Sequence, residues 1–294
     1  MNKKYLEDNN LYYNLSTGSY IKFFGEHLHL YPWPKGKTRN QAIKYTNDLI
    51  LQDGRLRSES NVIDLGCGIG SLSLLIASRY SCKITAININ SHQLDIAKKR
   101  SREKRAKIHF IQQDIMELRL KEHFNTCFMI DVEPHLPNKL RAMNSIKNLL
   151  KPGGRLVMTA WLQPEKTSFF QKEMLIKPYC KIAAFPFLET FGHYKSYFIK
   201  NNCKIIKFKD ITEETKRTVD YYYFLGLKLL NKYNSIGEIA KLVLDKNLIS
   251  TLLKKAGRES ILKTAENIFL GPVYTKLCMD AQLLKIGYFV VEKL

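Results

Sequence analysis

The chain has 294 residues, of which 45% are hydrophobic and 25% charged, a composition that is ordinary for a soluble globular protein. No apolar run approaches the length that spans a bilayer, and the polar N-terminus lacks the apolar core of a signal peptide, so we expect a cytoplasmic protein. The six cysteines form no C-x-x-C pair, which argues against a zinc ribbon or a dithiol redox motif.

The net charge of +20 has two explanations. An anionic partner, either nucleic acid or an acidic membrane surface, would account for it. A host whose proteins are generally rich in lysine, isoleucine and asparagine would account for it as well. The basic residues are spread along the whole chain and cluster only briefly, in residues 98–105, where they suit the solvated end of a helix. We therefore favour host composition.

The N-terminal region contains one expected loop and one expected helix. Residues 1–20 are polar and rich in tyrosine, with a turn signal at Ser16-Thr17-Gly18. Residues 23–34 are rich in aromatic residues and histidine, and their two prolines predict a loop. This loop is either a hydrophobic plug over the core or a lid that contacts a ligand. Thr38 is a suitable N-cap for an amphipathic helix that runs to about Leu51.

Strands and helices alternate from residue 61 onward. The expected strands are 61–65, 83–88, 107–112, 126–130 and 155–159, and the expected helices between them are 71–80, 92–105 and 138–150. Farther along, 203–210 and 284–292 predict two more strands, while 216–232, 236–256 and 258–270 predict helices. This order indicates an α/β fold with a doubly wound, mostly parallel sheet of seven strands and a helical cap inserted before the last strand. Ligands bind such sheets at the carboxyl ends of the strands, near the switch point beside the first strand.

The most informative motif lies at the end of the first strand, where a buried strand, three alternating glycines and a helix follow one another. Glycine permits positive φ and a close approach of the backbone to a ligand, and the new helix directs free N–H groups back into the turn. A dinucleotide fingerprint would have its third glycine at Ser71, whereas this chain has it at Gly70. The pattern D-x-G-x-G-x-G, with Asp64 inside the strand, resembles motif I of S-adenosylmethionine-dependent methyltransferases.

Two more strand ends offer contacts for an adenosine group. An acidic residue at the end of the second strand commonly holds the ribose hydroxyls, but here the position is Asn88, whose amide bonds a hydroxyl more weakly. Asp114 follows the third strand, where it would hold the adenine amino group or else cap the next turn. The predicted cofactor-binding residues are Asp64, Gly66, Cys67, Gly68, Gly70, Asn88, Ile89, Gln93, Asp114, Ile115 and Ile130.

Longer segments resemble the class I methyltransferases, and among them the branch of tocopherol C-methyltransferases and related small-molecule enzymes. Residues 24–29, F-G-E-H-L-H, resemble that branch's W-G-E-H-M-H signature. Residues 87–93 resemble its I-T-L-S-P-x-Q segment, and residues 131–139 resemble its E-S-G-E-H-M-P-D-K segment. The resemblance implies S-adenosyl-L-methionine as the methyl donor, S-adenosyl-L-homocysteine as the product, and a small, hydrophobic or lipid-like acceptor. It leaves open whether carbon, oxygen or nitrogen is methylated.

Methyl transfer needs a water-free site and, for an acceptor that loses a proton, a base. His135 follows the fourth strand and is the first candidate for the base; the alternative is a structural histidine packed against the lid. His29 and Glu26 are further catalytic candidates, although Glu26 would otherwise brace the lid or hold the methionine end of the cofactor. We predict no metal site, because His27 and His29 stand without the remaining ligands of a metal pattern. The residues predicted to contact the acceptor or the sulfonium are Tyr20, Phe24, Tyr31, Trp33 and Trp161.

Two other functions compete with this one. The charge would suit an RNA or DNA methyltransferase, but residues 131–135 read D-V-E-P-H instead of the D/N-P-P-Y/F of adenine N6 enzymes, and the chain has no Pro-Cys nucleophile. A non-catalytic protein that binds a cofactor or a lipid is the third hypothesis. Because both nucleic-acid methyltransferase motifs are missing, nucleic acid is not favoured as a partner. Peripheral contact with an anionic membrane would accompany a lipid acceptor, and the oligomeric state is left open.

We expect the chain to divide into four regions. Residues 1–55 would form an N-terminal lid and helices, and residues 56–162 the cofactor-binding core. Residues 163–280 would form a cap that binds the acceptor and includes one core strand near 203–210. Residues 281–294 would add the final core strand.

Overall fold

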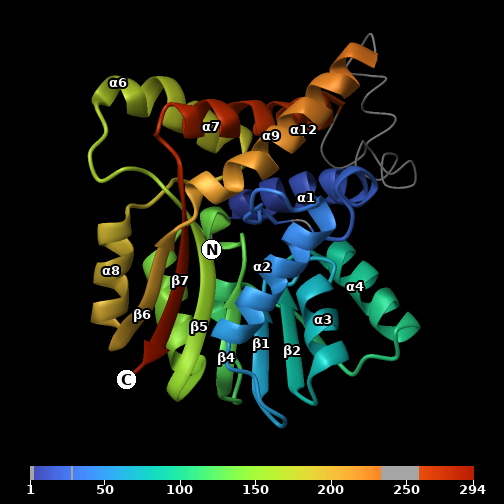
Figure 1. Ribbon diagram of the computed structural model, residues 1–294, viewed down its shortest axis with the longest axis vertical. Helices are drawn as coiled ribbons and strands as arrows, with labels where there is room; N and C mark the ends of the chain where they lie inside the picture. The colour runs from blue at the N-terminus through green and yellow to red at the C-terminus, as the bar shows by residue number, and fades with distance from the viewer. Residues whose placement is uncertain (1–2, 28, 233–257) are drawn as a thin grey trace.

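The computed structural model describes residues 3–27, 29–232 and 258–294, which form one seven-stranded sheet flanked by helices (Figure 1). The strand order is β3-β2-β1-β4-β5-β7-β6, and every pair is parallel except those that β7 makes with β5 and β6. The expectation of a doubly wound, mostly parallel sheet is confirmed. The strands are β1 (Asn61–Leu65), β2 (Lys83–Asn88), β3 (His109–Gln112), β4 (Phe124–Met129), β5 (Leu150–Leu162), β6 (Cys203–Asp210) and β7 (Lys285–Lys293).

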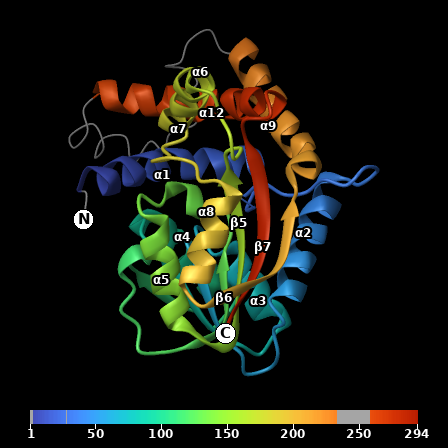
Figure 2. The same ribbon diagram turned by 90° about the vertical axis from the view of Figure 1, so that its left-hand side faces the viewer.

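Helices cover both faces of the sheet and the edge where its parallel strands end (Figures 1 and 2). One face carries α2 (Arg39–Asp53), α3 (Ser71–Arg79) and α4 (Ser91–Glu103), and the other carries α5 (Lys139–Leu149) and α8 (Phe191–Lys200). Short 3-10 turns, η1 (Ile115–Glu117) and η2 (Glu133–His135), follow β3 and β4. Within the described residues, no helix has both the length and the apolarity of a membrane span. The cap at the strand ends consists of α1 (Lys3–Phe24), α6 (Phe169–Gln171), the π-helical turn η3 (Lys172–Ile176), α7 (Lys177–Ile182), α9 (Thr212–Lys232) and α12 (Arg258–Asp280).

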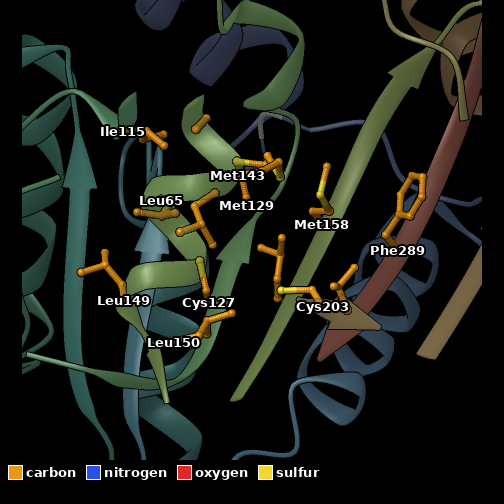
Figure 3. Close-up of a cluster of buried hydrophobic side chains, with 14 of the residues drawn as sticks. Leu65, Ile115, Cys127, Met129, Met143, Leu149, Leu150, Met158, Cys203 and Phe289 are labelled. Atoms are coloured by element: carbon orange, nitrogen blue, oxygen red, sulfur yellow. The ribbon is translucent and has the colours of Figure 1, made fainter. Parts of the chain in front are cut away.

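The packing of α5 against the sheet fixes the carboxyl end of β4. Figure 3 shows Cys127 and Met129 of β4 and Met158 of β5 beside Met143 and Leu149 of α5, and all five side chains are buried. The buried positions of α5 follow an i, i+3, i+4, i+7 pattern that starts at Lys139, and the buried residues after this lysine lay an apolar stripe on the sheet. Each such side chain contributes about 1.5–3 kcal/mol of burial free energy. The residues that follow Met129 are therefore held at a well-defined place on the sheet edge.

The first helix, α1, differs from the sequence-based expectation of a turn at Ser16-Thr17-Gly18. The helix continues through these residues, and the Thr17 hydroxyl donates to the backbone carbonyl of Tyr13, at 2.6 Å, inside the helix. Packing of α1 against α4 and α12 supplies the burial that overrides weak local helix propensity. The predicted loop of residues 23–34 accordingly begins only after the helix ends at Phe24.

The start of α2 agrees with the sequence-based prediction, whereas the start of β5 does not. The predicted N-cap is confirmed, because the Thr38 hydroxyl accepts from the Gln41 amide while the Gln41 side chain accepts from the Thr38 amide. The strand expected at residues 155–159 is longer at both ends, since β5 runs from Leu150 to Leu162. The predicted helix at 236–256 lies outside the described residues.

Candidate active site

Two clefts meet beneath the cap, at the carboxyl ends of the central strands. The glycine-loop cleft, together with its opening to solvent, has a volume of about 1090 Å³ and is lined by the turn after β1 and by the ends of β2, β3 and β4. The aromatic cleft, measured in the same way, has a volume of about 920 Å³ and is lined mainly by aromatic and apolar side chains of α1, β5 and the cap. The residues that line both clefts are Tyr13, Tyr20, His29, Asp131 and His135.

The glycine-loop cleft brings together ten of the eleven residues predicted to bind the cofactor. The exception is Gly70, which is the N-cap of α3 and does not line the cleft. Gly66 has φ +71°, and a Cβ there would lie 2.4 Å from the Val132 side chain, so this glycine lets the loop pack against the turn after β4. Gly68 has φ +53° and lines the cleft, and a Cβ there would meet no protein atom within 4 Å. Gly66 therefore serves packing, whereas Gly68 leaves space for a ligand.

Asp64 holds the glycine loop to the helix that follows it. Its Oδ2 accepts a hydrogen bond of 2.6 Å from the Ser73 hydroxyl in α3. Burial raises the pKa of Asp64 to about 6, because the charged form loses water. The carboxylate thus fixes the direction in which the free N–H groups at the start of α3 face the cleft.

Asp114 shows that both of its proposed roles are compatible. Its Oδ1 accepts from the Met116 amide at 2.8 Å and caps η1. Its Oδ2 is buried in the wall of the glycine-loop cleft and has no hydrogen-bond partner in the protein. Burial is also the main cause that raises the pKa of this carboxyl group. A buried acceptor without a partner is costly unless a ligand donates to it, as an adenine amino group would.

Asn88 is held in place by a chain of amide hydrogen bonds that reaches α1. Its Nδ2 donates to Gln93 Oε1 at 2.8 Å, and Gln93 Nε2 donates to the Thr17 hydroxyl at 2.9 Å. Asn90 continues this contact, because its Nδ2 donates to the side-chain oxygens of two asparagines in α1, at 2.9 and 3.1 Å. Gln93 therefore lines the cleft and also docks α1 over it.

Glu26 lines the glycine-loop cleft and is paired with an arginine of α4. Arg100 of α4 donates to the Glu26 carboxylate, and its guanidinium also donates to the Ile69 carbonyl at 2.6 Å. The Glu26 carbonyl in turn accepts from the Ser71 hydroxyl at 2.6 Å. The pairing of its carboxylate with Arg100 favours the alternative of a brace that ties the lid to the glycine loop, and a catalytic role of Glu26 stays a prediction.

The two candidate histidines lie on the wall between the clefts. His135 Nε2 accepts from the Tyr13 hydroxyl at 2.6 Å, and its Nδ1 lies 3.4 Å from the Ala184 carbonyl, which places the ring hydrogen on Nδ1. His29 Nε2 is buried and has no partner in the protein. Burial lowers the pKa of both His29 and His135 to about 4, so both rings are neutral at pH 7.

The aromatic residues predicted to contact the acceptor divide into two groups. Tyr20 and Trp161 line the aromatic cleft. Tyr31 and Trp33 line neither cleft: the Tyr31 hydroxyl accepts from Arg39, and the Trp33 ring packs on the Arg217 guanidinium. The structure places both rings in a cluster with α2 and α9 instead. The side chain of Phe24 lies outside the described residues.

Two residues of the shared wall were missed by the sequence analysis. Asp131 follows β4 with φ +54°, a conformation that aspartate tolerates better than most residues. Its Oδ1 accepts from Thr159 Oγ1 at 2.9 Å and from Trp161 Nε1 at 3.1 Å, and its Oδ2 accepts from the Leu30 amide at 2.6 Å. Tyr13 was missed because its helix was not predicted. Only the tertiary fold brings these segments together.

Comparison with known proteins identifies the class of this domain. Residues 56–186 match the methyltransferase domain family. Together with the sheet order, this match shows that the chain carries a class I, S-adenosylmethionine-dependent methyltransferase domain.

The similar proteins include methyltransferases and a cyclopropane synthase. The chain is 26% identical to a sterol 24-C-methyltransferase of Pneumocystis carinii over 249 residues, which are 82% of this chain and 66% of the relative. It spans 44% of the sterol 24-C-methyltransferase of Kluyveromyces lactis. Among solved structures, the cyclopropane synthase MmaA2 from Mycobacterium tuberculosis has a TM-score of 0.77 at 12% identity, with 98% of each chain covered. The geranyl diphosphate C-methyltransferase of Streptomyces coelicolor A3(2) has a TM-score of 0.66 at 12% identity, with 100% and 99% covered. At these identities the structures show the fold alone, and the tocopherol branch stays a prediction.

Proposed function

We propose that this chain transfers a methyl group from S-adenosyl-L-methionine to a small, apolar, lipid-like acceptor in the aromatic cleft. The observation that carries the proposal is the wall shared by the two clefts, because methyl transfer requires donor and acceptor to meet in line. When bound, S-adenosyl-L-methionine supplies an electrophilic methyl group. The names of the sterol and geranyl diphosphate enzymes support an acceptor of lipid-like chemistry.

The glycine-loop cleft fits this cofactor. Gly68 leaves its part of the wall open to a ligand, and the N-terminus of α3 presents N–H groups beside it. Asp114 Oδ2 would accept from the adenine amino group, which gives this buried oxygen its missing partner. Ile89 and Ile115 provide apolar surface in the same wall for the adenine ring.

The aromatic cleft suits an acceptor without negative charge. Its described lining contains no lysine or arginine, although the chain has a net charge of +20. The two histidines on the shared wall are neutral at pH 7, and both oxygens of Asp131 are already hydrogen-bonded. An anionic group in this cleft would therefore lose its water without gaining a charged partner. We propose a neutral, apolar body with one reactive polar or unsaturated position.

Tyr13 and His135 provide a path for a proton that the acceptor releases. The Tyr13 hydroxyl lies on the shared wall and already donates to His135 Nε2. If the Tyr13 oxygen takes the acceptor's proton, its own proton passes to Nε2 along the existing hydrogen bond. The Ala184 carbonyl holds Nδ1–H and so keeps Nε2 as the acceptor.

We further propose that the protein works in the reducing cytoplasm, in peripheral contact with an anionic membrane. Its six cysteines are all unpaired, which supports a reducing compartment. A lipid-like acceptor resides in bilayers, which supports contact with a membrane.

Transfer of labelled methyl groups into a host extract tests the proposed reaction. We expect label in a fraction that partitions into organic solvent and survives nuclease and protease. Label confined to RNA or protein would refute a lipid-like acceptor while keeping methyl transfer. Absence of any label, together with tight binding of S-adenosyl-L-homocysteine, would support the non-catalytic alternative.

A further inference from the structure

The segment between β5 and α7 exposes three large apolar side chains within six residues. Phe169 is 81% exposed, Phe170 68% and Met174 56%, and Phe169 is the most exposed large apolar side chain in the described part of the chain. Single exposed apolar residues are common on soluble proteins, but a contiguous group marks an interaction surface. No described element covers these three side chains.

Positive charge surrounds the same apolar group. Glu165 and Glu173 oppose four lysines in residues 165–181, which leaves a net charge of +2 (four minus two), and Glu173 is itself paired with one of the lysines. All four lysines are exposed: Lys166, Lys172, Lys177 and Lys181. Apolar side chains ringed by lysines are typical of segments that lie in a membrane interface.

The opposite side of this segment lines the aromatic cleft. Tyr179 of α7 is buried, lines the cleft and stacks on Trp161 at a ring-centroid distance of 6.4 Å. Phe185, just after α7, also lines the cleft and contacts both rings. In both ribbon views α6 lies at the end of the cap that points away from the sheet (Figures 1 and 2). One short segment therefore faces solvent with phenylalanines and faces the acceptor site with aromatic rings.

We propose that residues 166–181 form a membrane-docking segment that inserts Phe169, Phe170 and Met174 into an anionic lipid surface. The four lysines would then lie among the headgroups. Charge favours this partner over a second copy of the chain, because a second copy would present the same positive surface. The inference rests on the proposed function only in that a lipid-like acceptor has to be collected from a membrane.

Sedimentation of the full chain with lipid vesicles tests the segment directly. We expect binding to vesicles of phosphatidylcholine with phosphatidylserine, and much weaker binding to phosphatidylcholine alone. The double variant F169S/F170S should lower the partition coefficient by about tenfold or more, since two apolar anchors are lost. The variant K166E/K172E should lower it by a similar factor, because each lysine near an anionic surface contributes about fivefold. Salt should reduce this second effect.

Matched controls come from α8, which packs on the sheet and outside the cap. Ile199 is 65% exposed and Lys195 is exposed, so I199S and K195E test whether any exposed apolar or basic residue has the same effect. Both should leave the partition coefficient unchanged. All variants should bind S-adenosyl-L-homocysteine like the wild type, which shows that they fold.

Each outcome decides the assignment. The assignment would be overturned if F169S/F170S bound vesicles like the wild type. It would also be overturned if this double variant differed from the wild type only in its oligomeric mass in solution, since the three apolar side chains would then be a self-association face. A wild-type protein that binds vesicles but not S-adenosyl-L-homocysteine would refute the proposed function and keep the docking segment. The reverse result would refute the segment and keep the function.

Discussion

At the scale of single residues, Asp114 performs two tasks with two oxygens. In Asp114→Asn the side-chain oxygen must take the place of Oδ1, because the Met116 amide still needs an acceptor there. The side-chain NH₂ group then takes the place of Oδ2 in the cleft wall. That NH₂ would oppose the donating amino group of adenine. We expect S-adenosyl-L-homocysteine to bind about tenfold more weakly by calorimetry, with an unfolding free energy within about 0.5 kcal/mol of wild type.

The neighbouring Glu117→Gln provides the control for Asp114→Asn. Glu117 pairs with Arg141 at the surface and does not line the cleft. The Glu117→Gln protein should bind S-adenosyl-L-homocysteine like the wild type. An Asp114→Asn protein with wild-type affinity would remove Asp114 from the adenine site.

Substitutions of Gly66 and Gly68 should cause different defects, one in stability and the other in cofactor binding. Gly68→Ala adds a Cβ to the cleft wall where no protein atom lies, so it should abolish most cofactor affinity at a strain cost of about 1–2 kcal/mol. Gly66→Ala would force its Cβ to 2.4 Å from Val132, so it should destabilise the fold more than Gly68→Ala does. Urea unfolding and calorimetry together separate the two effects. Equal losses of unfolding free energy in the two variants would contradict a packing role for Gly66 and a ligand-facing role for Gly68.

The proton path predicts a loss of turnover without loss of cofactor. Tyr13→Phe and His135→Ala should each lower the rate of methyl incorporation by about 10²-fold or more, provided that the acceptor releases a proton. Affinity for S-adenosyl-L-homocysteine should change less than about threefold. Tyr12→Phe is the matched control, because Tyr12 also lies on α1 and lines the aromatic cleft but bonds to Tyr20. Unchanged rates in both variants would mean that the reaction needs no base.

The residues that could be predicted are those whose place follows from a strand end. Gly68, Asn88 and Asp114 come directly after β1, within β2 and after β3, so the alternating pattern was enough to bring them to one cleft. Tyr31 and Trp33 alternate with Pro32 and Pro34 in the loop after α1, and nothing local sets the direction of such a loop. Their burial against α2 and α9 is a tertiary contact, which a period of 2 or 3.6 does not encode.

At the scale of elements, α1 covers the glycine-loop cleft and is held there by hydrogen bonds from amide side chains. Gln93→Ala would remove the hydrogen bonds to Asn88 and Thr17, each worth about 0.5–1.5 kcal/mol. We expect limited proteolysis to cut within α1 several-fold faster in this variant, and S-adenosyl-L-homocysteine to restore part of the protection. Gln112→Ala, which loses one exposed bond to the Ile89 carbonyl, should be cleaved like the wild type. Equal cleavage of the two variants would show that the amide chain does not hold α1.

The helices that could be predicted are those that bury one clear stripe. The apolar face and caps of α2, α4 and α5 made their existence plain, because each packs on a sheet that was itself predictable. The helix α1 buries Ser16 and Thr17 as well as Leu15, so its polar sequence resembled a turn. Its partners, α4 and α12, are distant in the sequence.

At the scale of the whole molecule, buried titratable groups make stability depend on pH. Burial lowers the pKa of His135 to about 4, so between pH 6.5 and 4 the unfolded chain binds a proton that the folded chain does not, and stability falls as pH drops. Burial raises the pKa of Asp64 to about 6 and that of Glu133 to about 7, and these groups act in the opposite direction.

Comparison of variants isolates the histidine contribution. Between pH 7 and 4.5, His135→Gln should lose less unfolding free energy than the wild type, by on the order of 1–3 kcal/mol. The exposed His123→Gln should follow the wild-type curve in urea titrations. A His135→Gln curve parallel to that of the wild type would mean that His135 titrates alike in both states.

The carboxylate of Asp131 joins the lid at Leu30 to the indole of Trp161, and this bond gives the protein a built-in optical reporter. The chain has two tryptophans, and the other, Trp33, lines neither cleft. In a Trp33→Phe background the emission would come from Trp161 alone. Its intensity and colour would then follow both the filling of the aromatic cleft and the seating of the lid. Rapid mixing could therefore time the arrival of an unlabelled acceptor.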